Sequence, residues 1–412
     1  MLERNETVAI IGQGYVGLPL AMAAIKAGWN VIGIENSPAK FAGISSGISP
    51  VEDVPSSDIQ DAMSKGQYRI SNSVSGVKEA SIVTICVPTP LNADRSPDLS
   101  ILEQAVLDIA PHLVSGTLVI NESTSFPGTL RDFIQPRITE NKAGADVVVH
   151  LAVAPERVNP GDIKWHQKNT PRLVGGLDEE AADLAVKFYS SVCDEVVRVS
   201  SPEVAETAKL LENTFRLVNI ALVNQLTQLC ADQDINVHEV IDAASTKPYG
   251  FMRFTPSVGV GGHCIPVDPM YLSWWAEKNG NRASMIDHSD AINIGMPIYV
   301  SKRVRDLVDG TSSAKRVLIM GVAYKPGVKD VRETPVTALR DDLMSNGYEV
   351  GWIDPLVADW EGSSPVDISW ECDVAVIATA QPGLPVENIS ARGIPILDCT
   401  GVFKDLANVV RL

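Results

Sequence analysis

The chain has 412 residues, and its 51 acidic against 34 basic side chains give a formal net charge of −17. This length exceeds the size at which one hydrophobic core keeps growing, so two or three domains are expected. The acidic balance excludes nucleic acid and anionic membranes as partners bound by bulk attraction, because both require clustered Lys and Arg. An anionic small ligand would need a locally basic pocket.

The cysteine pattern predicts neither a metal site nor a disulfide framework. No pair has CxxC spacing among Cys86, Cys193, Cys230, Cys264, Cys372 and Cys399, which favours reduced thiols. The first residues are partly acidic and lead directly into a predicted strand, unlike a signal peptide. No stretch reaches the roughly 18 uninterrupted apolar residues of a membrane span. We therefore expect a cytoplasmic protein.

The first 35 residues have the pattern of a dinucleotide-binding unit. Residues 7–11 form a short apolar run typical of a buried parallel strand, and Gly12-Gln-Gly-Tyr-Val-Gly17 follows at once. A helix is predicted over 18–27 and a second strand over 30–34, which ends at Glu35. Strand, glycines, helix, strand and acid occur in the order of a Rossmann fingerprint. The alternative is an α/β unit whose turn binds nothing.

Each residue of this motif has an expected role. Gly12 permits the tight turn, Gly14 lets backbone N–H groups reach a pyrophosphate at the helix N-terminus, and Gly17 allows close helix packing. Glu35 is expected to accept hydrogen bonds from the ribose hydroxyls, which favours NAD because a carboxylate repels the 2′-phosphate of NADP. Lys40 lies near enough in sequence to complicate that preference.

Strand-like runs recur over 81–87, 117–120 and 147–153, separated by helical or polar segments. This alternation predicts a doubly wound parallel sheet, whose ligands bind at the C-terminal ends of the strands. Polar motifs follow these runs, namely Pro88-Thr-Pro90, Glu122-Ser-Thr124 and Ala154-Pro-Glu-Arg-Val-Asn-Pro-Gly161. They are candidates for lining a pocket, or they are loops whose prolines and hydroxyls satisfy turn geometry.

A long helix is predicted from about residue 201 to 232, and its N-terminus carries Ser, Pro and Glu in the positions that favour helix initiation. Lys209, Asn213 and Arg216 lie on one face of this helix. The polar face could be a solvated stripe. Alternatively, Lys209 and Asn213, one turn apart, could stabilise an oxyanion.

The segment from Gly259 to Pro269 places Cys264 in a glycine-rich backbone, with Asp268 four residues later. Its three glycines leave room for a substrate carbon to approach the backbone. A cysteine can form a thioester and release it to water, provided that it reaches the thiolate state and a nearby group manages the protons. Asp268 is the nearest candidate for that role. The alternative is a buried cysteine in a glycine-rich turn.

The C-terminal part has a second α/β pattern after the loop-like segment Asp309–Ala314. Predicted elements are a strand within 315–326, a helix over 335–346 and strands over 348–353, 373–378 and 394–398. This part lacks GxGxxG. Its basic residues Lys325, Lys329 and Arg332 cluster after the first strand, so a phosphorylated group other than NAD is expected there.

The predicted fold class is α/β, with two Rossmann-like doubly wound parallel-sheet domains joined by a central helical domain. The expected boundaries are 1–199, 200–310 and 311–412. The long helix and the apolar helices after it would expose large surfaces in a lone chain, so a homodimer or a higher homo-oligomer is expected.

Over essentially its whole length the chain resembles the nucleotide-sugar 6-dehydrogenases, the family of UDP-glucose and UDP-N-acetylhexosamine dehydrogenases. The resemblance rests on motifs in the family order, at 12–17, 86–90, 122–124, 155–157, 208–216, 261–268, 321–326 and 332–335. It implies an N-terminal NAD domain, a central helical domain that usually forms the dimer interface, and a C-terminal domain for UDP.

The resemblance also implies a mechanism. Cys264 would be the nucleophile in a two-step, four-electron oxidation of the sugar C6 alcohol to a carboxylate, through a thiohemiacetal and a thioester. Lys209 and Asn213 would stabilise oxyanions, and Lys209 could also give and take protons. Asp268, Thr124 and Glu156 would position water or move protons.

Two sets of contacts follow from the same resemblance. The cofactor NAD would contact Gly12, Gly14, Tyr15, Val16, Gly17, Glu35, Lys40, Thr89, Thr124 and Arg332. The UDP-sugar would contact Arg157, Val158, Lys209, Asn213, Arg216, Tyr249, Gly250, Arg253, Gly261, His263, Tyr324 and Lys325.

Departures from the UDP-glucose pattern indicate the substrate. Val267 replaces the lysine of GGxCxPKD, and Pro160 stands where a second acid is expected. Both changes resemble the UDP-N-acetylhexosamine branch, and Cys-Ile-Pro followed by Tyr-Leu-Ser-Trp favours UDP-GlcNAc, with UDP-ManNAc next. The rivals are a UDP-glucose 6-dehydrogenase, a single-step hydroxyacid dehydrogenase that needs no Cys264, and a non-catalytic sensor of nucleotide sugars.

Overall fold

The computed structural model describes all residues except 1–5, 159–163, 309–315, 404 and 407. The segment Asp309–Ala314 that the sequence suggests as a linker therefore lies outside the described residues. The chain divides into two compact units, residues 1–212 with 274–279 and residues 213–273 with 280–412. No helix in the described parts of the chain is long and apolar enough to span a bilayer.

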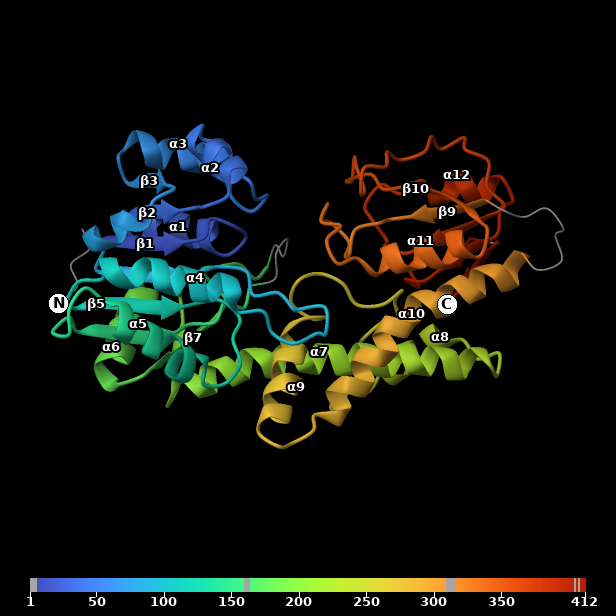
Figure 1. The fold of residues 1–412 in the computed structure, drawn as a ribbon. Coiled ribbons are helices and arrows are strands. Elements are labelled where there is room, and N and C mark those ends of the chain that lie inside the picture. The colour runs from blue at the N-terminus through green and yellow to red at the C-terminus, as the bar shows by residue number, and fades with distance from the viewer. Residues whose placement is uncertain (1–5, 159–163, 309–315, 404, 407) are drawn as a thin grey trace. The chain divides into compact units, whose positions relative to one another are not determined.

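The first unit contains an eight-stranded sheet of order β3-β2-β1-β4-β5-β6-β7-β8 (Figure 1). Its strands are β1 Thr7–Ile11, β2 Asn30–Ile34, β3 Tyr68–Ser71, β4 Ile82–Ile85, β5 Thr117–Asn121, β6 Val149–Val153, β7 Arg172–Gly176 and β8 Val196–Arg198. All neighbours pair in parallel except β6 and β7. Because the strand order reverses at β1 and β4, a ligand crevice is expected beyond their carboxyl ends.

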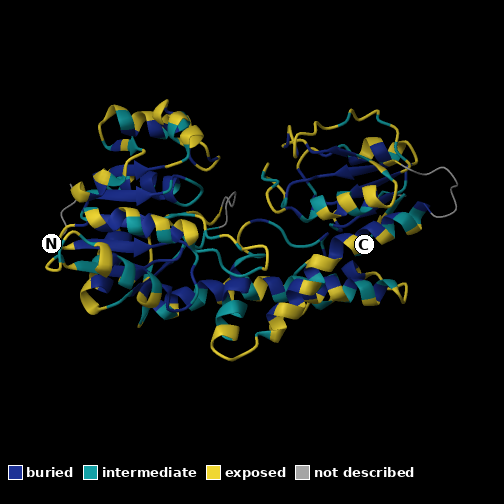
Figure 2. Cartoon of the chain, in the orientation of Figure 1, coloured by how far each residue is buried: buried dark blue, intermediate teal, exposed yellow. Residues whose placement is uncertain are grey.

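Helices cover both faces of this sheet. They are α1 Gly17–Lys26, α2 Pro38–Ser45, α3 Ser56–Ser64, α4 Ser100–Ile109, α5 Gln135–Asn141 and α6 Glu179–Val192, together with the π-helix η3 Thr129–Ile134. Side chains of β1 alternate between two cores: Val8 and Ile10 pack with α1 and α6, whereas Ala9 and Ile11 pack with α4 and η3. This period of two explains the nearly continuous apolar strands, which Figure 2 shows as buried.

The helices that follow the first sheet and precede the second in sequence are α7 Pro202–Ala231, α8 Val237–Ala244, α9 Asp268–Lys278 and α10 Ser284–Val308. The predicted long helix is thus confirmed as α7. In the second unit, the buried side chains of Asn224 on α7 and Asn293 on α10 share a hydrogen bond of 2.9 Å. Asn224 also accepts a bond from the backbone of Ser257, at the start of the glycine-rich segment.

The second unit contains a five-stranded parallel sheet of order β10-β9-β11-β12-β13. Its strands are β9 Arg316–Met320, β10 Glu349–Ile353, β11 Val374–Ile377, β12 Ile396–Asp398 and β13 Val409–Arg411, and its helices are α11 Pro335–Ser345 and α12 Val386–Ala391. The predicted fold class is confirmed.

The turns after the first-described strand of each sheet, β1 and β9, have the same geometry. The sequence did not indicate this similarity, because the C-terminal part lacks GxGxxG. Gly12 after β1 has φ +90°, and a Cβ there would lie 2.4 Å from the carbonyl oxygen of Cys86. Gly321 after β9 has φ +81°, and a Cβ there would lie 2.0 Å from the carbonyl oxygen of Thr379. Only glycine fits either position, so both sheets begin with a tight turn against the end of a neighbouring strand.

Candidate active site

The glycine loop between β1 and α1 fits a dinucleotide pyrophosphate. A Cβ on Gly17 would lie 1.9 Å from the carbonyl oxygen of Gly12, so the helix packs directly on the turn. Space around Gly14 is open, and the nearest neighbour of a Cβ there is the Nζ of Lys40 at 3.9 Å. The first turn of α1 carries no acid. Backbone N–H groups, the helix dipole and a lysine ammonium thus favour an anion at this loop.

Glu35 lies buried after β2, and its carboxylate is held by the loop. Oε2 accepts a hydrogen bond from the backbone N–H of Gln13 at 3.0 Å, and Oε1 accepts one from Ser37 at 2.8 Å. Each carboxylate oxygen has a second acceptor site, so the group retains capacity for ribose hydroxyls.

The side chain of Gln13 was not singled out by sequence reasoning, yet it braces this corner. It donates to the carbonyl of Ile10 at 2.8 Å and accepts from the hydroxyl of Tyr68 at 2.8 Å. Burial and the nearby Glu35 carboxylate raise the pKa of Tyr68, so the phenol remains a protonated donor. A glutamine inside the glycine motif is the signal that could have indicated this role.

The motifs after β4 and β5 are brought together by one hydroxyl. Ser123 Oγ accepts from the backbone N–H of Val87 at 2.9 Å and donates to the carbonyl of Ile85 at 3.3 Å. Thr89 and Thr124, the candidates from these two motifs, are both half-buried. The expectation that both loops leave the same edge of the sheet is therefore met.

A buried ion pair lies beneath these loops, between Glu122 after β5 and Arg172 on β7. Their side chains are 3.2 Å apart, and Tyr189 OH also donates to the glutamate. Burial raises the pKa of Glu122, and Arg172 and Tyr189 oppose that shift. Arg172 donates to the carbonyl of Ala154 at 3.3 Å as well, so it joins the ends of β5 and β6. A lone arginine within the apolar run Arg-Leu-Val-Gly-Gly was its only sequence signal.

The loop after β6 holds Glu156, Arg157 and Val158, which are all half-buried. Glu156 Oε1 accepts from the backbone N–H of Val158. Arg157 donates through Nε to Glu212 on α7 at 3.0 Å and through Nη1 to the carbonyl of Pro171 at 2.9 Å. Its guanidinium is thus fixed by protein groups. The rest of the motif, including Pro160, lies outside the described residues.

The polar face of α7 is not a uniformly solvated stripe. Lys209 is 8% exposed, Asn213 is half-buried and Arg216 is exposed. The charge of Lys209 acts on the buried Glu122 and lowers its pKa. A buried ammonium with a carboxylate in its field differs from an ordinary surface lysine, which favours the functional interpretation of Lys209.

Asp268 is buried at the start of α9 and joins two candidate groups. Its Oδ2 accepts from Asn213 Nδ2 at 2.7 Å, and its backbone N–H donates to the carbonyl of Cys264 at 2.8 Å. Asp268 is 1% exposed, whereas Cys264 is exposed. An accessible thiol therefore lies one turn before a buried carboxylate. The second bond lies at the N-terminus of α9, which begins at Asp268.

The glycines before Cys264 meet protein groups rather than leaving open space. Gly262 has φ +82°, and a Cβ there would lie 2.8 Å from the ring of Tyr324. A Cβ on Gly261 would lie 2.7 Å from the carbonyl oxygen of Glu333 and 2.8 Å from Pro335. The glycines thus let the cysteine segment pack closely on the loops that follow β9. Sequence reasoning had explained them by the approach of a substrate carbon.

Basic residues of the second unit lie beside this segment. Arg332 pairs with Asp330 at 2.6 Å, and Lys325 Nζ lies 5.8 Å from the ring centroid of Tyr324. Burial, then the charge of Arg332, lowers the pKa of His263. Arg332 and His263 are therefore neighbours, and a neutral imidazole beside a cation suits a polar, anionic ligand.

Three further candidates lie on the loop after α8. Tyr249 is exposed, Gly250 has φ +65°, and Arg253 pairs with Asp242 on α8 at 2.6 Å. They remain predictions.

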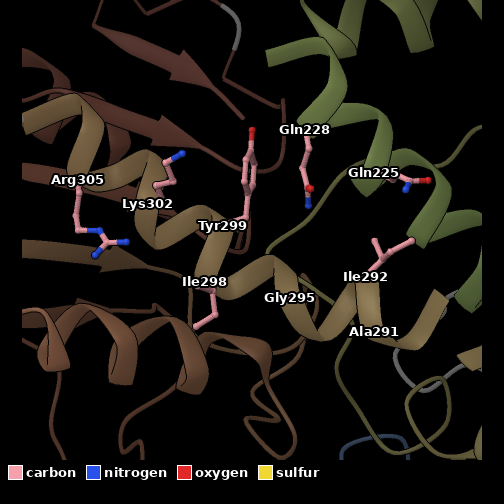
Figure 3. A pocket seen from close by; sticks show the side chains of 9 residues that line it. All are labelled: Gln225, Gln228, Ala291, Ile292, Gly295, Ile298, Tyr299, Lys302 and Arg305. Atoms are coloured by element: carbon pink, nitrogen blue, oxygen red, sulfur yellow. The ribbon is translucent and has the colours of Figure 1, made fainter. Parts of the chain in front are cut away.

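A cavity of about 430 Å³ lies between α7 and α10 in the second unit (Figure 3). Its lining residues are Gln225, Gln228, Ala291, Ile292, Gly295, Ile298, Tyr299, Lys302 and Arg305. None of them belongs to the predicted site.

Family models match three successive parts of the chain. They describe the UDP-glucose/GDP-mannose dehydrogenase family and match its NAD binding domain over residues 6–193, its central domain over 203–294 and its UDP binding domain over 318–404. The NAD binding match includes the glycine loop, and the central match includes Lys209 and Cys264. The NAD cofactor expected from the glycine motif is confirmed.

Relatives cover most of the chain. The UDP-N-acetyl-D-mannosamine dehydrogenase of Pyrococcus horikoshii is 35% identical over 393 residues, which are 94% of this chain and 92% of the relative. The protein of the same name from Escherichia coli K12 is 34% identical over 350 residues, 81% of this chain and 82% of the relative.

Solved structures agree with the sequence comparisons. The structure of the Pyrococcus horikoshii UDP-D-ManNAc dehydrogenase matches with a TM-score of 0.89 and 31% identity and covers 98% of both chains. That of the Staphylococcus aureus UDP-N-acetyl-mannosamine dehydrogenase matches with a TM-score of 0.86 and 29% identity, over 98% of this chain and 97% of the other. The chain therefore belongs to the UDP-glucose/GDP-mannose dehydrogenase family of NAD-dependent nucleotide-sugar oxidoreductases.

Proposed function

We propose that this dehydrogenase oxidises the C6 alcohol of a UDP-N-acetylhexosamine to the carboxylate in two successive steps. The observation that carries the proposal is the accessible thiol of Cys264, whose carbonyl is bonded to the backbone of the buried Asp268. Oxidation of an alcohol to an aldehyde needs no nucleophile. Oxidation of the aldehyde to an acid does, because addition of a nucleophile turns the aldehyde carbon into a tetrahedral carbon that bears an oxyanion, and hydride can then leave through its one remaining C–H bond.

The balance of the reaction assigns each step. NAD supplies the hydride acceptor, one molecule for each oxidation. After the first oxidation, the Cys264 sulfur attacks the aldehyde carbon, and a C–S bond forms to give a thiohemiacetal. Loss of the second hydride leaves a thioester, and water then adds to its carbonyl. The C–S bond breaks, and the products are the carboxylate and the regenerated thiol.

The roles of the other residues follow from their charges. Lys209 is a buried cation that would stabilise the oxyanion on C6 in both adducts, and Asn213 would donate a hydrogen bond to it. Lys209 could also give and take the C6 hydroxyl proton. Asp268, Thr124 and Glu156 would position water or move protons: the two carboxylates could accept the proton of the hydrolytic water, and the Thr124 hydroxyl could relay the proton that the C6 alcohol loses in the first oxidation. These assignments rest on the family motifs and on the contacts described within each unit.

Two observations give different orders for the sugar epimers. The Cys-Ile-Pro motif with Tyr-Leu-Ser-Trp favours UDP-GlcNAc, whereas the relatives carry the name UDP-N-acetyl-D-mannosamine dehydrogenase. The relatives align with most of the chain, whereas the two motifs cover only a short stretch of it. We therefore place UDP-ManNAc first and UDP-GlcNAc second among the substrates to test.

The test is incubation with NAD and, separately, UDP-ManNAc, UDP-GlcNAc, UDP-GalNAc and UDP-glucose, with NADH and product mass followed together. The expected result is two NADH per sugar and a uronate product. Cys264→Ser should abolish acid formation, whereas Cys372→Ser, at a half-buried cysteine elsewhere, should not. One NADH per sugar would support a single-step dehydrogenase, and binding without NADH would support a sensor.

We also propose that the protein is a homodimer or a higher homo-oligomer. The helix α7 exposes the large apolar side chains Leu211, Phe215, Leu222 and Leu229, with Leu222 and Leu229 each 61% exposed. Their spacing of four and seven residues places them along one stripe, which a lone chain would leave in water. Light scattering that shows a stable, active monomer would overturn this proposal.

A further inference from the structure

Glu206 is a buried acid on α7, one turn before Lys209. Its side chain reaches the loop that follows Thr124: Oε2 accepts from the backbone N–H of Gly128 at 2.7 Å, and Oε1 accepts from that of Leu130 at 3.0 Å. The hydroxyl of Ser125 is 3.4 Å from Oε1. All of these residues belong to the first unit.

The two amides are at the N-terminus of the π-helix η3. The first turn of a helix has N–H groups without intrahelical partners, and a local side chain usually accepts from them. Here the N-cap is Gly128, in the left-handed region at φ +96°, and η3 has no cap from its own segment. Glu206 takes that role from a distance of more than 70 residues in sequence. The shape of this loop therefore depends on α7.

A second contact holds the same loop from another side. The ring of Phe126 lies 5.1 Å from that of Trp274, and both residues belong to the first unit. Trp274 is on α9, the helix that begins at Asp268. The loop is thus fixed by Glu206 on the helix that carries Lys209 and by an aromatic contact on the helix that begins with Asp268.

We propose that Glu206 is a positioning residue that sets Thr124 relative to Lys209 and thereby supports hydride removal from C6. This inference rests on the proposed function in one respect: it requires Thr124 to act in the first oxidation of the C6 alcohol. Glu206 itself touches the loop backbone, and its effect on the reaction passes through Thr124.

The surroundings of Glu206 separate it from an ordinary surface acid. Burial raises the pKa of Glu206 to about 8, although the amides of Gly128 and Leu130 lower it. The adjacent charge of Glu203 raises it further, and Glu203 itself pairs with Arg131 at 2.8 Å. Burial of this carboxyl group costs solvation free energy, and its two oxygens accept from the two amides at the start of η3.

Glu206→Gln is the most specific change. The amide side chain keeps the shape but has one acceptor oxygen, so its NH₂ group would face a backbone N–H donor. Glu203→Gln is the matched control, because Glu203 lies three residues earlier and pairs with an exposed arginine. We expect Glu206→Gln to lower the single-turnover rate of the first NADH at least about 10-fold, with KM values for NAD and UDP-sugar within about 2-fold. Glu203→Gln should leave that rate within about 2-fold.

A double variant shows whether the effect passes through Thr124. If it does, Glu206→Gln combined with Thr124→Ala should be no slower than Thr124→Ala alone. Three outcomes would overturn the proposal. The first is a double variant in which the rate losses of Glu206→Gln and Thr124→Ala multiply. The others are a Glu206→Gln variant with a normal first-NADH rate, or one with a raised KM and an unchanged kcat. If Glu206→Gln does not fold, Glu206→Asp replaces it, with the same rate criterion. Because the readout is the first NADH, a finding of one NADH per sugar would sink the thioester mechanism and leave this test intact.

Discussion

The side-chain amide of Asn213 donates a 2.7 Å hydrogen bond to the buried carboxylate of Asp268. The two residues are 55 positions apart and lie on different helices, α7 and α9. A carboxylate that is 1% exposed requires such a donor, because an unpaired buried charge is costly. The bond therefore fixes the first turn of α9, which begins four residues after Cys264.

Replacement of Asn213 by alanine removes this donor, and we expect the main effect to be a lower kcat. Hydrogen bonds to charged groups contribute about 1.5 to 3 kcal/mol, so Asn213→Ala should lower kcat by about 10- to 100-fold. Asn219→Ala is the control, because the amide of Asn219 bonds only to the carbonyl of Phe215 on its own helix among the hydrogen bonds described. Steady-state kinetics of the two variants, Asn213→Ala and Asn219→Ala, give the two kcat values to compare. A kcat of Asn213→Ala within 2-fold of the parent would show that Asp268 needs no such partner.

The ion pair of Glu122 and Arg172 leads to a prediction about pH. Burial raises the pKa of Glu122, and Arg172 is the main group that opposes this shift. An acid whose folded pKa lies above its unfolded value stabilises the fold less as pH rises through that interval. Arg172→Met would raise the folded pKa further. The variant should therefore be close to the parent near pH 4 and lose about 3 to 5 kcal/mol of stability near neutral pH.

Thermal unfolding of the first unit at several pH values tests this directly. Arg198→Met is the control, since Arg198 pairs with Glu179 and Asp183 at the surface, and its loss should cost at most about 1 kcal/mol. Glu122→Gln added to Arg172→Met should remove most of the pH dependence. A loss of stability in Arg172→Met that is the same at pH 4 and pH 8 would contradict the assignment.

Local patterns in the sequence predicted much of this fold. The strands at 7–11 and 30–34, the helix α7 and the order of glycines and acid in the first 35 residues all depend on neighbours in sequence. They are set by hydrophobic period and turn chemistry, which a single sequence displays. The strands β7 and β8 were missed, because β7 begins with the buried Arg172 and β8 has only three residues.

Long-range pairings could not be predicted in the same way. The partner of Glu122 is 50 residues away, and that of Arg157 is 55 residues away on α7. The sequence shows that such a charge exists but not which group neutralises it. For the glycines before Cys264, the pattern predicted the approach of a substrate carbon, whereas the structure places the ring of Tyr324 against Gly262.

Glu35 gives a prediction about cofactor choice. Its two oxygens accept from the amides of Gln13 and Ser37, and the group lies at the end of β2, where a ribose is expected. Glu35→Ser should raise KM for NAD by about 10- to 100-fold, because charge-assisted hydrogen bonds are lost. Glu35→Ser should also reduce the preference for NAD over NADP, because the carboxylate that repels the 2′-phosphate of NADP is gone. The Lys40 ammonium near Gly14 could then pair with that phosphate.

The check on Glu35 is the ratio of kcat/KM for the two cofactors. Glu79→Gln serves as the control, since Glu79 is exposed and pairs with the exposed Arg69 at 3.0 Å. An unchanged ratio in Glu35→Ser would mean that another group discriminates the 2′-phosphate.

The contact between Gly262 and Tyr324 allows the sharpest comparison, because the chain contains a matched glycine. Gly262 has φ +82° and Gly280 has φ +75°, so an alanine at either position carries similar backbone strain, about 1 to 3 kcal/mol. A Cβ at 262 would also lie 2.8 Å from the Tyr324 ring, whereas nothing lies within 4 Å of one at 280. The difference between the two variants therefore isolates the packing of the cysteine segment on Tyr324.

Gly280→Ala should lower stability and leave kcat/KM for the UDP-sugar unchanged. Gly262→Ala should lower kcat/KM at least about 10-fold, since a displacement of about 1 Å near the reacting group has effects of this size. Equal activities in the two variants would show that this contact does not position Cys264.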